Sequence, residues 1–121
     1  MALKDLIKTH FETSDREMDP TLQTHYYKNN YAQCKEAVIQ ATKADNFTVA
    51  FEDDLRQELM IKRKDAEIIV SMVRISPIET ALDLTVNTSG VISMGKGKKI
   101  IIALYAQLDK KLSLKGLALK R

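Results

Sequence analysis

The chain has 121 residues, 45% of them hydrophobic and 29% charged, which predicts one globular domain over residues 1–121. The longest apolar run, residues 100–106, is far shorter than the roughly 18 residues that span a bilayer, so a transmembrane helix is excluded. Cys34 is the only cysteine, which excludes an intramolecular disulfide and a cluster of metal-binding thiolates. The N-terminal residues lack the apolar core of a signal peptide, so we expect a cytoplasmic protein.

The formal net charge of +3 is divided unevenly along the chain. Residues 96–121 hold eight basic residues and one acidic residue, whereas residues 1–95 hold eleven basic and fifteen acidic residues. The C-terminal segment is therefore basic and the remainder is acidic. This division predicts either that the C-terminal segment faces an acidic partner, such as an anionic lipid surface or nucleic acid, or that it is a solvated basic tail.

The first predicted element is a short amphipathic helix over residues 2–12, because apolar side chains recur there at helical spacing. Residues 13–20 are polar, contain Asp-Pro and indicate a linker. We therefore interpret residues 1–21 as an N-terminal helix and its linker.

A strand and a second helix follow the linker. The aromatic-rich stretch LQTHYYK, residues 22–28, predicts the strand. Asn29 or Asn30 can then cap a helix that runs through Lys43, because apolar residues again recur with a period near four.

From Asn46 onward the apolar period shortens to two, which is typical of half-buried strands. Four strands are predicted, at residues 47–51, 58–64, 67–75 and 80–87. The turns between them are short, so neighbouring strands should pair antiparallel. The strand at residues 67–75 is apolar on both faces. Its second face needs a cover, either the N-terminal helix or a second subunit, and we expect a homodimer more than a monomer.

The last predicted element is a long C-terminal helix that begins after Ser89-Gly90. Its continuous apolar stripe consists of Ile101, Leu104, Tyr105, Leu108 and Leu112. Residues 113–121 are interpreted as a basic C-terminal tail that either docks or stays mobile. We expect the helix to cover a sheet face made of Phe47, Val49, Leu59, Ile61, Leu82, Leu84 and Val86.

These elements predict an α+β fold, with an antiparallel sheet of about five strands packed on the C-terminal helix. Their order is β-α-β-β-β-β-α after the short N-terminal helix, and it resembles the TATA-box-binding-protein-like and helix-grip folds. The stretches DPTLQTHYYK, PIETALDLTVNT and GKGKKIIIALYAQLDKKLSLKG also resemble a family of small, uncharacterised cytosolic proteins from Gram-positive bacteria. This resemblance implies no activity and no functional residues.

The segment MGKGKK, residues 94–99, carries the main candidate site. It matches neither the Walker loop, GxxxxGK[ST], nor the dinucleotide fingerprint GxGxxG. Lysines suit a helix N-terminus poorly, because its partial charge is positive. We predict a weak anion site of backbone N–H and ammonium groups, with a loop of hydrated lysines as the alternative. The predicted site residues are Gly95, Lys96, Gly97, Lys98 and Lys99.

The remaining candidates for chemistry indicate no catalytic residue, no cofactor and no metal site. Neither His10 nor His25 has a carboxylate or cysteine at metal-ligand spacing, so a zinc site is not expected. Cys34 is expected to be a buried, unreactive side chain.

Acidic residues at two places in the sequence are further candidates for a site. The three successive carboxylates at residues 52–54 lack the spaced ligands of a calcium loop and are expected to form a solvated turn. Asp83 is expected either to face solvent or, if the sheet is covered on both faces, to pair with Arg74 or Lys62.

These observations predict a small, non-catalytic binding domain rather than an enzyme. One hypothesis is that it binds an apolar ligand or lipid in a groove between sheet and helix. The alternatives are peripheral binding to anionic membranes or nucleic acid through the basic C-terminal segment, and a protein-interaction or self-association module.

Overall fold

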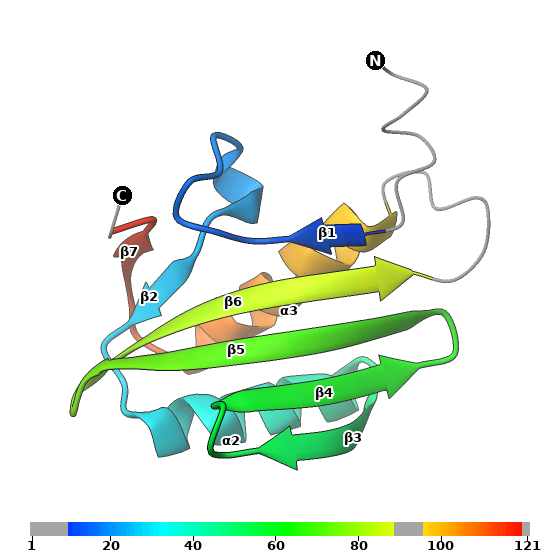
Figure 1. The fold of residues 1–121 in the computed structure, drawn as a ribbon, viewed down its shortest axis with the longest axis horizontal. Helices are drawn as coiled ribbons and strands as arrows, with labels where there is room; N and C mark the ends of the chain where they lie inside the picture. Colours follow the sequence, from blue (N-terminus) through cyan, green and yellow to red (C-terminus); the bar gives the residue numbers. More distant parts are fainter. Residues whose placement is uncertain (1–9, 89–95, 120–121) are drawn as a thin grey trace.

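The computed structural model describes residues 10–88 and 96–119, which form one antiparallel sheet with two α-helices on one of its faces (Figure 1). The strands are β1 (His10–Glu12), β2 (His25–Tyr27), β3 (Thr48–Asp53), β4 (Glu58–Arg63), β5 (Ala66–Ser76), β6 (Glu79–Thr88) and β7 (Leu114–Leu117). The helices are α2 (Tyr31–Ala44), α3 (Lys96–Lys111) and the short 3-10 helix η1 (Pro20–Leu22). Within these residues, no helix is both long and apolar enough to cross a membrane.

Strand β6 organises the sheet, whose order is β3-β4-β5-β6-β2-β7. One edge of β6 pairs with β5 along nearly its whole length. The other edge is shared by two short strands. Residues 80–82 pair with β2, and residues 85–87 pair with β1, which lies beyond the end of β2 (Figure 1).

The core lies between the sheet and the two helices, which lie side by side behind the sheet in Figure 1. Helix α2 begins at a capping box in which Asn30 accepts from the Gln33 backbone and the Gln33 side chain accepts from the Asn30 backbone. The predicted core is confirmed: Val49 is partly buried against the cluster, and the other predicted residues are at most 5% exposed. These are Phe47, Leu59, Ile61, Leu82, Leu84, Val86, Leu104, Tyr105 and Leu108.

The predicted order β-α-β-β-β-β-α is present from β2 to α3, but three details of the prediction are wrong. The sheet has seven strands rather than five. Residues 10–12 form β1 and not the end of a helix, because the backbone groups of residues 85–87 on one edge of β6 need hydrogen-bond partners. The rest of the predicted helix, residues 2–9, lies outside the described residues. Helix α3 is not the last element, because the predicted tail contributes β7 to the free edge of β2.

Truncation of Leu104 should test whether α3 seals the core. Leu104 is 2% exposed, so Leu104→Ala should lower the free energy of unfolding by about 2–5 kcal/mol. Ile102 lies on the same helix but is 44% exposed, and Ile102→Ala should cost less than about 1 kcal/mol. Urea unfolding followed by circular dichroism measures both. Equal losses for the two variants would contradict this account of α3.

Candidate functional site

A polar cluster lies where β1 and β2 leave a gap along the edge of β6. There the Thr13 N–H donates to the Leu84 carbonyl at 2.9 Å, and the Leu84 N–H donates to Thr13 Oγ1 at 2.9 Å. The hydroxyls of Thr13 and Thr24 each donate to Asp83 Oδ1 at 2.6 Å. Side-chain hydroxyls thus take the place of the missing strand at this point of the sheet.

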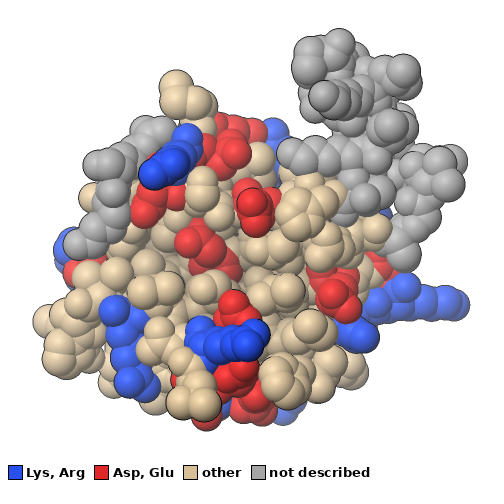
Figure 2. Space-filling model, in the orientation of Figure 1, with Lys and Arg blue, Asp and Glu red and all other residues tan. Residues whose placement is uncertain are grey.

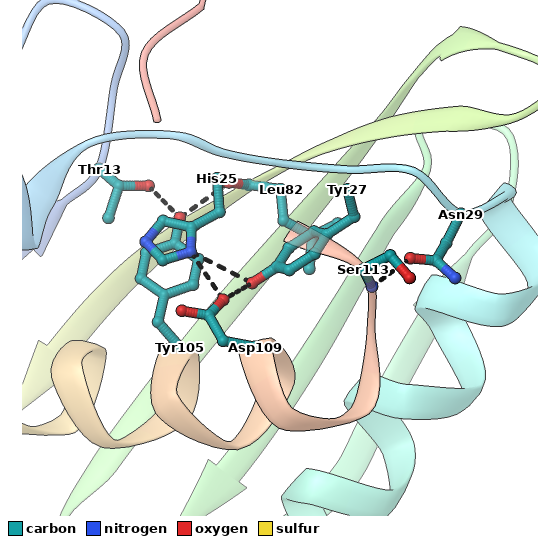
Figure 3. Close-up of polar contacts among 8 residues, drawn as sticks. All are labelled: Thr13, His25, Tyr27, Asn29, Leu82, Tyr105, Asp109 and Ser113. Carbon is teal, nitrogen blue, oxygen red and sulfur yellow. Dashed lines mark hydrogen bonds and ion pairs between the residues drawn. The ribbon is translucent and has the colours of Figure 1, made fainter. Parts of the chain in front are cut away.

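Tyr105 of α3 reaches this gap from the helical side. Its hydroxyl donates to the Leu82 carbonyl at 2.8 Å and lies 3.1 Å from Thr13 Oγ1 (Figure 3). The rings of Tyr105 and His25 stack nearly parallel, with 3.5 Å between their centroids and 4° between their planes. Tyr105 therefore ties α3 both to β6 and to β2.

His25 and Tyr27 lie on the helical face of β2 and meet Asp109 of α3 (Figure 3). Tyr27 Oη donates to Asp109 Oδ1 at 2.6 Å, and His25 Nδ1 lies 3.0 Å from the same oxygen and 3.2 Å from Tyr27 Oη. Since a carboxylate can only accept, Nδ1 carries the proton. The imidazole is thereby held in the tautomer that leaves a lone pair on Nε2.

Burial dominates the electrostatics of this cluster. It lowers the pKa of His25 below the ordinary value of 6.5, although the neighbouring Asp109 carboxylate acts in the opposite direction. Burial also raises the pKa of Tyr27, of Tyr105 and of the Asp83 carboxyl group. At neutral pH the imidazole is thus uncharged and both phenols keep their protons.

A pocket of about 250 Å³ opens beside His25, lined by Thr21, His25, Ile102, Tyr105, Ala106 and Asp109. Nδ1 makes both hydrogen bonds of the His25 ring, and Nε2 points away from Tyr27 (Figure 3). No buried side-chain nitrogen or oxygen in the described ranges lacks a partner. Nε2 has no hydrogen-bond partner there, so it must reach the open space of the pocket. The His25 residue as a whole is only 6% exposed.

The Gly-Lys segment starts α3, and two of its lysines hold carboxylates of the same chain. Lys96 Nζ lies 2.7 Å from Asp65 Oδ2, and Lys98 Nζ lies 2.6 Å from Asp19 Oδ2. The hydrogen bond from Lys98 is the main cause that lowers the pKa of Asp19 to about 2. Lys99 is exposed, and Gly95 lies outside the described residues. The misplaced charges at the helix start therefore have protein carboxylates as counterions.

Gly97 has a packing role that the sequence motif did not reveal. It is buried, and a Cβ atom at this position would lie 2.6 Å from Cδ2 of Phe11. The absence of a side chain lets the ring of Phe11 in β1 pack directly on the first turn of α3. Of the predicted site residues, the structure thus brings Lys96, Gly97 and Lys98 into contact with other parts of the chain.

The other candidates take ordinary structural positions. Cys34 is buried, as expected, and burial raises the pKa of its thiol. His10 Nδ1 lies 2.6 Å from Asn87 Oδ1. Among residues 10–88 and 96–119, no three His, Cys, Asp or Glu side chains are grouped as a metal site would require.

Both acidic groups have partners that were not anticipated. Asp83 is partly buried and is not paired with Arg74 or Lys62, because it lies in the gap of the sheet and accepts from two threonines. Residues 52–54 are not a solvated turn as expected, because Glu52 and Asp53 end strand β3. Glu52 and Asp54 lie 2.8 and 2.9 Å from the ammonium group of Lys35 of α2.

The sequence reasoning missed the pairing of His25 with Asp109, which are 84 residues apart. Two local signals existed. His25 and Tyr27 share one face of β2, and Tyr105 and Asp109 are spaced i, i+4 on α3. Each pair puts polar groups on a surface that the apolar pattern predicts to be buried.

Comparisons with known proteins provide no relative for this arrangement, because no family model and no curated protein matches the chain. The resemblance to small Gram-positive bacterial proteins and to the TATA-box-binding-protein-like fold therefore stays a prediction.

The buried, neutral state of His25 predicts a specific pH dependence of stability. The pKa of His25 is lower in the folded state than the unfolded value near 6.5. Below pH 6.5 the imidazole is therefore protonated more readily in the unfolded state than in the folded state. Stability should therefore fall as pH decreases from about 6.5, by at most about 1.4 kcal/mol per pH unit. Urea unfolding between pH 7.5 and pH 5 should show this loss in the wild type and in His10→Gln, but not in His25→Gln. A decline of equal slope in His25→Gln would contradict it.

Gly97→Ala should destabilise the protein although alanine favours helices. The added methyl group must displace the Phe11 ring, a cost of about 1–3 kcal/mol that exceeds the helix-propensity gain of about 1 kcal/mol. Gly116→Ala is the matched control, because its Cβ would meet only the side chain of Leu119, which is 46% exposed and can move. Thermal and urea unfolding compare the two variants, and a stabilised Gly97→Ala protein would refute the packing role.

Proposed function

We propose that this protein is a non-catalytic binding domain whose pocket at His25 takes a small molecule with an N–H donor on an apolar body. One observation carries the proposal: His25 is nearly fully buried, yet its Nε2 has no partner in the described chain and faces the pocket. An acceptor that opens onto the pocket can accept from water or from a ligand, and an N–H donor on a ligand would replace that water.

The chemistry of the pocket defines the class of ligand. Asp109 Oδ1 accepts from Tyr27 and His25, whereas Oδ2 has no hydrogen-bond partner among the described residues and lies on the same side as His25 Nε2 (Figure 3). The pocket therefore offers two acceptors and a negative charge, which favours a neutral or cationic nitrogen donor over an anion. Ile102 and Ala106 provide an apolar wall. A volume of about 250 Å³ holds a ligand the size of roughly eight water molecules.

Binding is better supported than catalysis. His25 and Asp109 have the geometry of a proton-accepting dyad, but a nucleophile would have to stand beside it. Among the described residues that line the pocket, Thr21 has the one aliphatic hydroxyl, and it donates to Asp19 Oδ1 at 2.8 Å. Tyr105 is held by the backbone of β6 and its raised pKa keeps the phenol protonated.

The earlier alternatives receive less support. An apolar ligand between sheet and helix would need to enter a layer whose side chains are almost completely buried against one another. Binding of anions by the Gly-Lys segment would have to compete with Asp65 and Asp19, which already hold Lys96 and Lys98. Both hypotheses place the ligand where the chain supplies its own partners.

The test follows the imidazole nitrogens by nuclear magnetic resonance in uniformly ¹⁵N-labelled protein. Benzylamine and benzamide supply N–H donors on an apolar ring, and benzoate is the matched anionic probe without a donor. The amine and the amide should shift the Nε2 signal of His25 in a saturable way and leave the signals of His10 unchanged. Ala106→Leu fills the pocket and should abolish the shift, whereas Ala103→Leu, one turn away on the exposed side of α3, should retain it.

The proposal fails if neither donor shifts Nε2 at millimolar concentration. It fails equally if benzoate binds as well as the amine, or if Ala106→Leu binds as the wild type does. Ala106→Leu and Ala103→Leu should both melt close to the wild-type temperature, because both positions are exposed. This measurement shows that the fold of each variant is intact.

A further inference from the structure

Two apolar surfaces on opposite sides of the molecule have no cover in the described chain. One is the face of the sheet turned away from the helices, which faces the viewer in Figures 1 and 2. The other is the outward side of α3, which lies behind the sheet. Soluble monomers rarely expose large apolar surfaces, and such surfaces often mark interaction sites.

On the open face of the sheet, apolar side chains of neighbouring strands lie opposite one another and form a row across the strands. Phe51 lies opposite Met60, and Met60 lies opposite Ile69, so that β3, β4 and β5 form one continuous row. Phe51 is 58% exposed, and Val73, further along β5, is 46% exposed. The predicted apolar second face of this strand is therefore present, and no helix of the described chain covers it.

Carboxylates surround this row. Strand alternation places six acidic residues on the open face. Three of them have a cationic partner nearby: Glu67 lies 3.6 Å from Lys62, Asp53 lies 3.7 Å from Arg56, and Glu79 lies 2.7 Å from Lys115. The acids are Glu12, Asp53, Glu58, Glu67, Glu79 and Asp83, of which Asp83 accepts from Thr13 and Thr24. Figure 2 shows acidic side chains across the middle of this face, with basic side chains toward its lower part and its edges. The open face is thus both apolar and negatively charged.

The outward side of α3 has the opposite charge. Its segment IIIALYA is apolar all round, a pattern typical of a helix covered on every side, yet Ile102 is 44% exposed. Apart from Lys111, the exposed residues of α3 follow one helical stripe with apolar side chains in the middle and a lysine at each end. They are Lys99, Ile102, Ala103, Ala106 and Lys110.

We propose that the outward stripe of α3 of one copy docks on the open sheet face of another copy. Charge complementarity selects this occupant: the stripe brings lysines to a face rich in carboxylates, and apolar side chains meet in the middle. The dimensions agree, because the helix rises about 16 Å from Lys99 to Lys110 and the strand extends about 20 Å from Glu67 to Val73.

Docking of unlike faces has a definite consequence for assembly. After two copies associate, one copy keeps a free face and the other keeps a free stripe, so the contact is heterologous and does not close at a dimer. Two open faces packed against each other would instead close a dimer, but that arrangement places the carboxylates of both copies together. Like charges at such a contact are repulsive, which favours the head-to-tail arrangement.

Sedimentation velocity of the full chain tests the proposal. The weight-average mass should rise beyond that of a dimer between about 10 µM and about 1 mM, and the rise should shrink as salt increases from about 0.05 M to about 0.5 M. Two variants each disable one surface. Phe51→Lys/Val73→Lys removes the open face, and Ile102→Glu/Ala106→Glu removes the stripe.

Each variant alone should remain monomeric over this range. An equimolar mixture should form a 1:1 dimer and nothing larger, because each variant still has the surface that the other lacks. Leu55→Ser/Ile78→Ser is the matched control, since these apolar side chains are 97% and 76% exposed but belong to neither surface, and it should assemble as the wild type does.

Three results would overturn the proposal. The first is a wild type that stays monomeric at about 1 mM. The second is a wild-type mass that stops rising at that of a dimer and is lowered to that of a monomer only by the open-face variant, as face-to-face packing would require. The third is a variant mixture that stays monomeric while both variants keep the circular dichroism and melting behaviour of folded protein.

Discussion

Strand β6 must satisfy its backbone hydrogen bonds on both edges, and one of those edges has no single long partner. Strands β1 and β2 cover its two ends, and the groups around Leu84 are left to the backbone and hydroxyl of Thr13. An unpaired backbone group at a buried position costs as much as a lost hydrogen bond, so this junction has to be closed. The order of the sheet, the entry of the chain and the docking of α3 all depend on that closure.

The polar character of the site follows from this requirement. Thr13 and Thr24 come to the junction with hydroxyls, and Asp83 accepts from both. Tyr105 then bonds the carbonyl of Leu82, and His25 stacks on its ring. Once the imidazole is buried there, Asp109 fixes its tautomer and Nε2 is turned to the pocket. The groups that complete the hydrogen bonds along the edge of β6 therefore also place His25 Nε2, an acceptor without a partner among the described residues, at the pocket.

Sequence periodicity predicted those elements that have enough residues to show a period. The stripe of α3, the capping asparagine of α2 and the alternation in β4, β5 and β6 are each visible locally, and the core residues follow from them. Strands β1 and β7 could not be predicted in this way. They have three and four residues, and their structure is set by the free edges of β6 and β2 rather than by their own pattern.

The candidate site was beyond local reasoning for a related reason. The lysines at the start of α3 predicted an unfavourable interaction with the helix dipole. The carboxylates that pair with these lysines, Asp65 and Asp19, come from distant loops and could not be predicted locally. His25 and Asp109 meet only because β2 is placed beside β6 under α3. Periodicity indicates which face of an element is buried, and it contains no information about which buried faces meet.

The shared edge of β6 also determines when the chain can fold. His10 pairs with Asn87, 77 residues later, and β6 ends at residue 88 of 121. Helix α2 and strands β3 to β5 lie between β2 and β6 in the sequence, so the partners on this edge of β6 are far apart in the chain. Contacts of such long range make folding slow, since the closure of a large loop precedes any gain from pairing. The edge of β6 on which the site depends should therefore be among the slowest contacts of the fold to form.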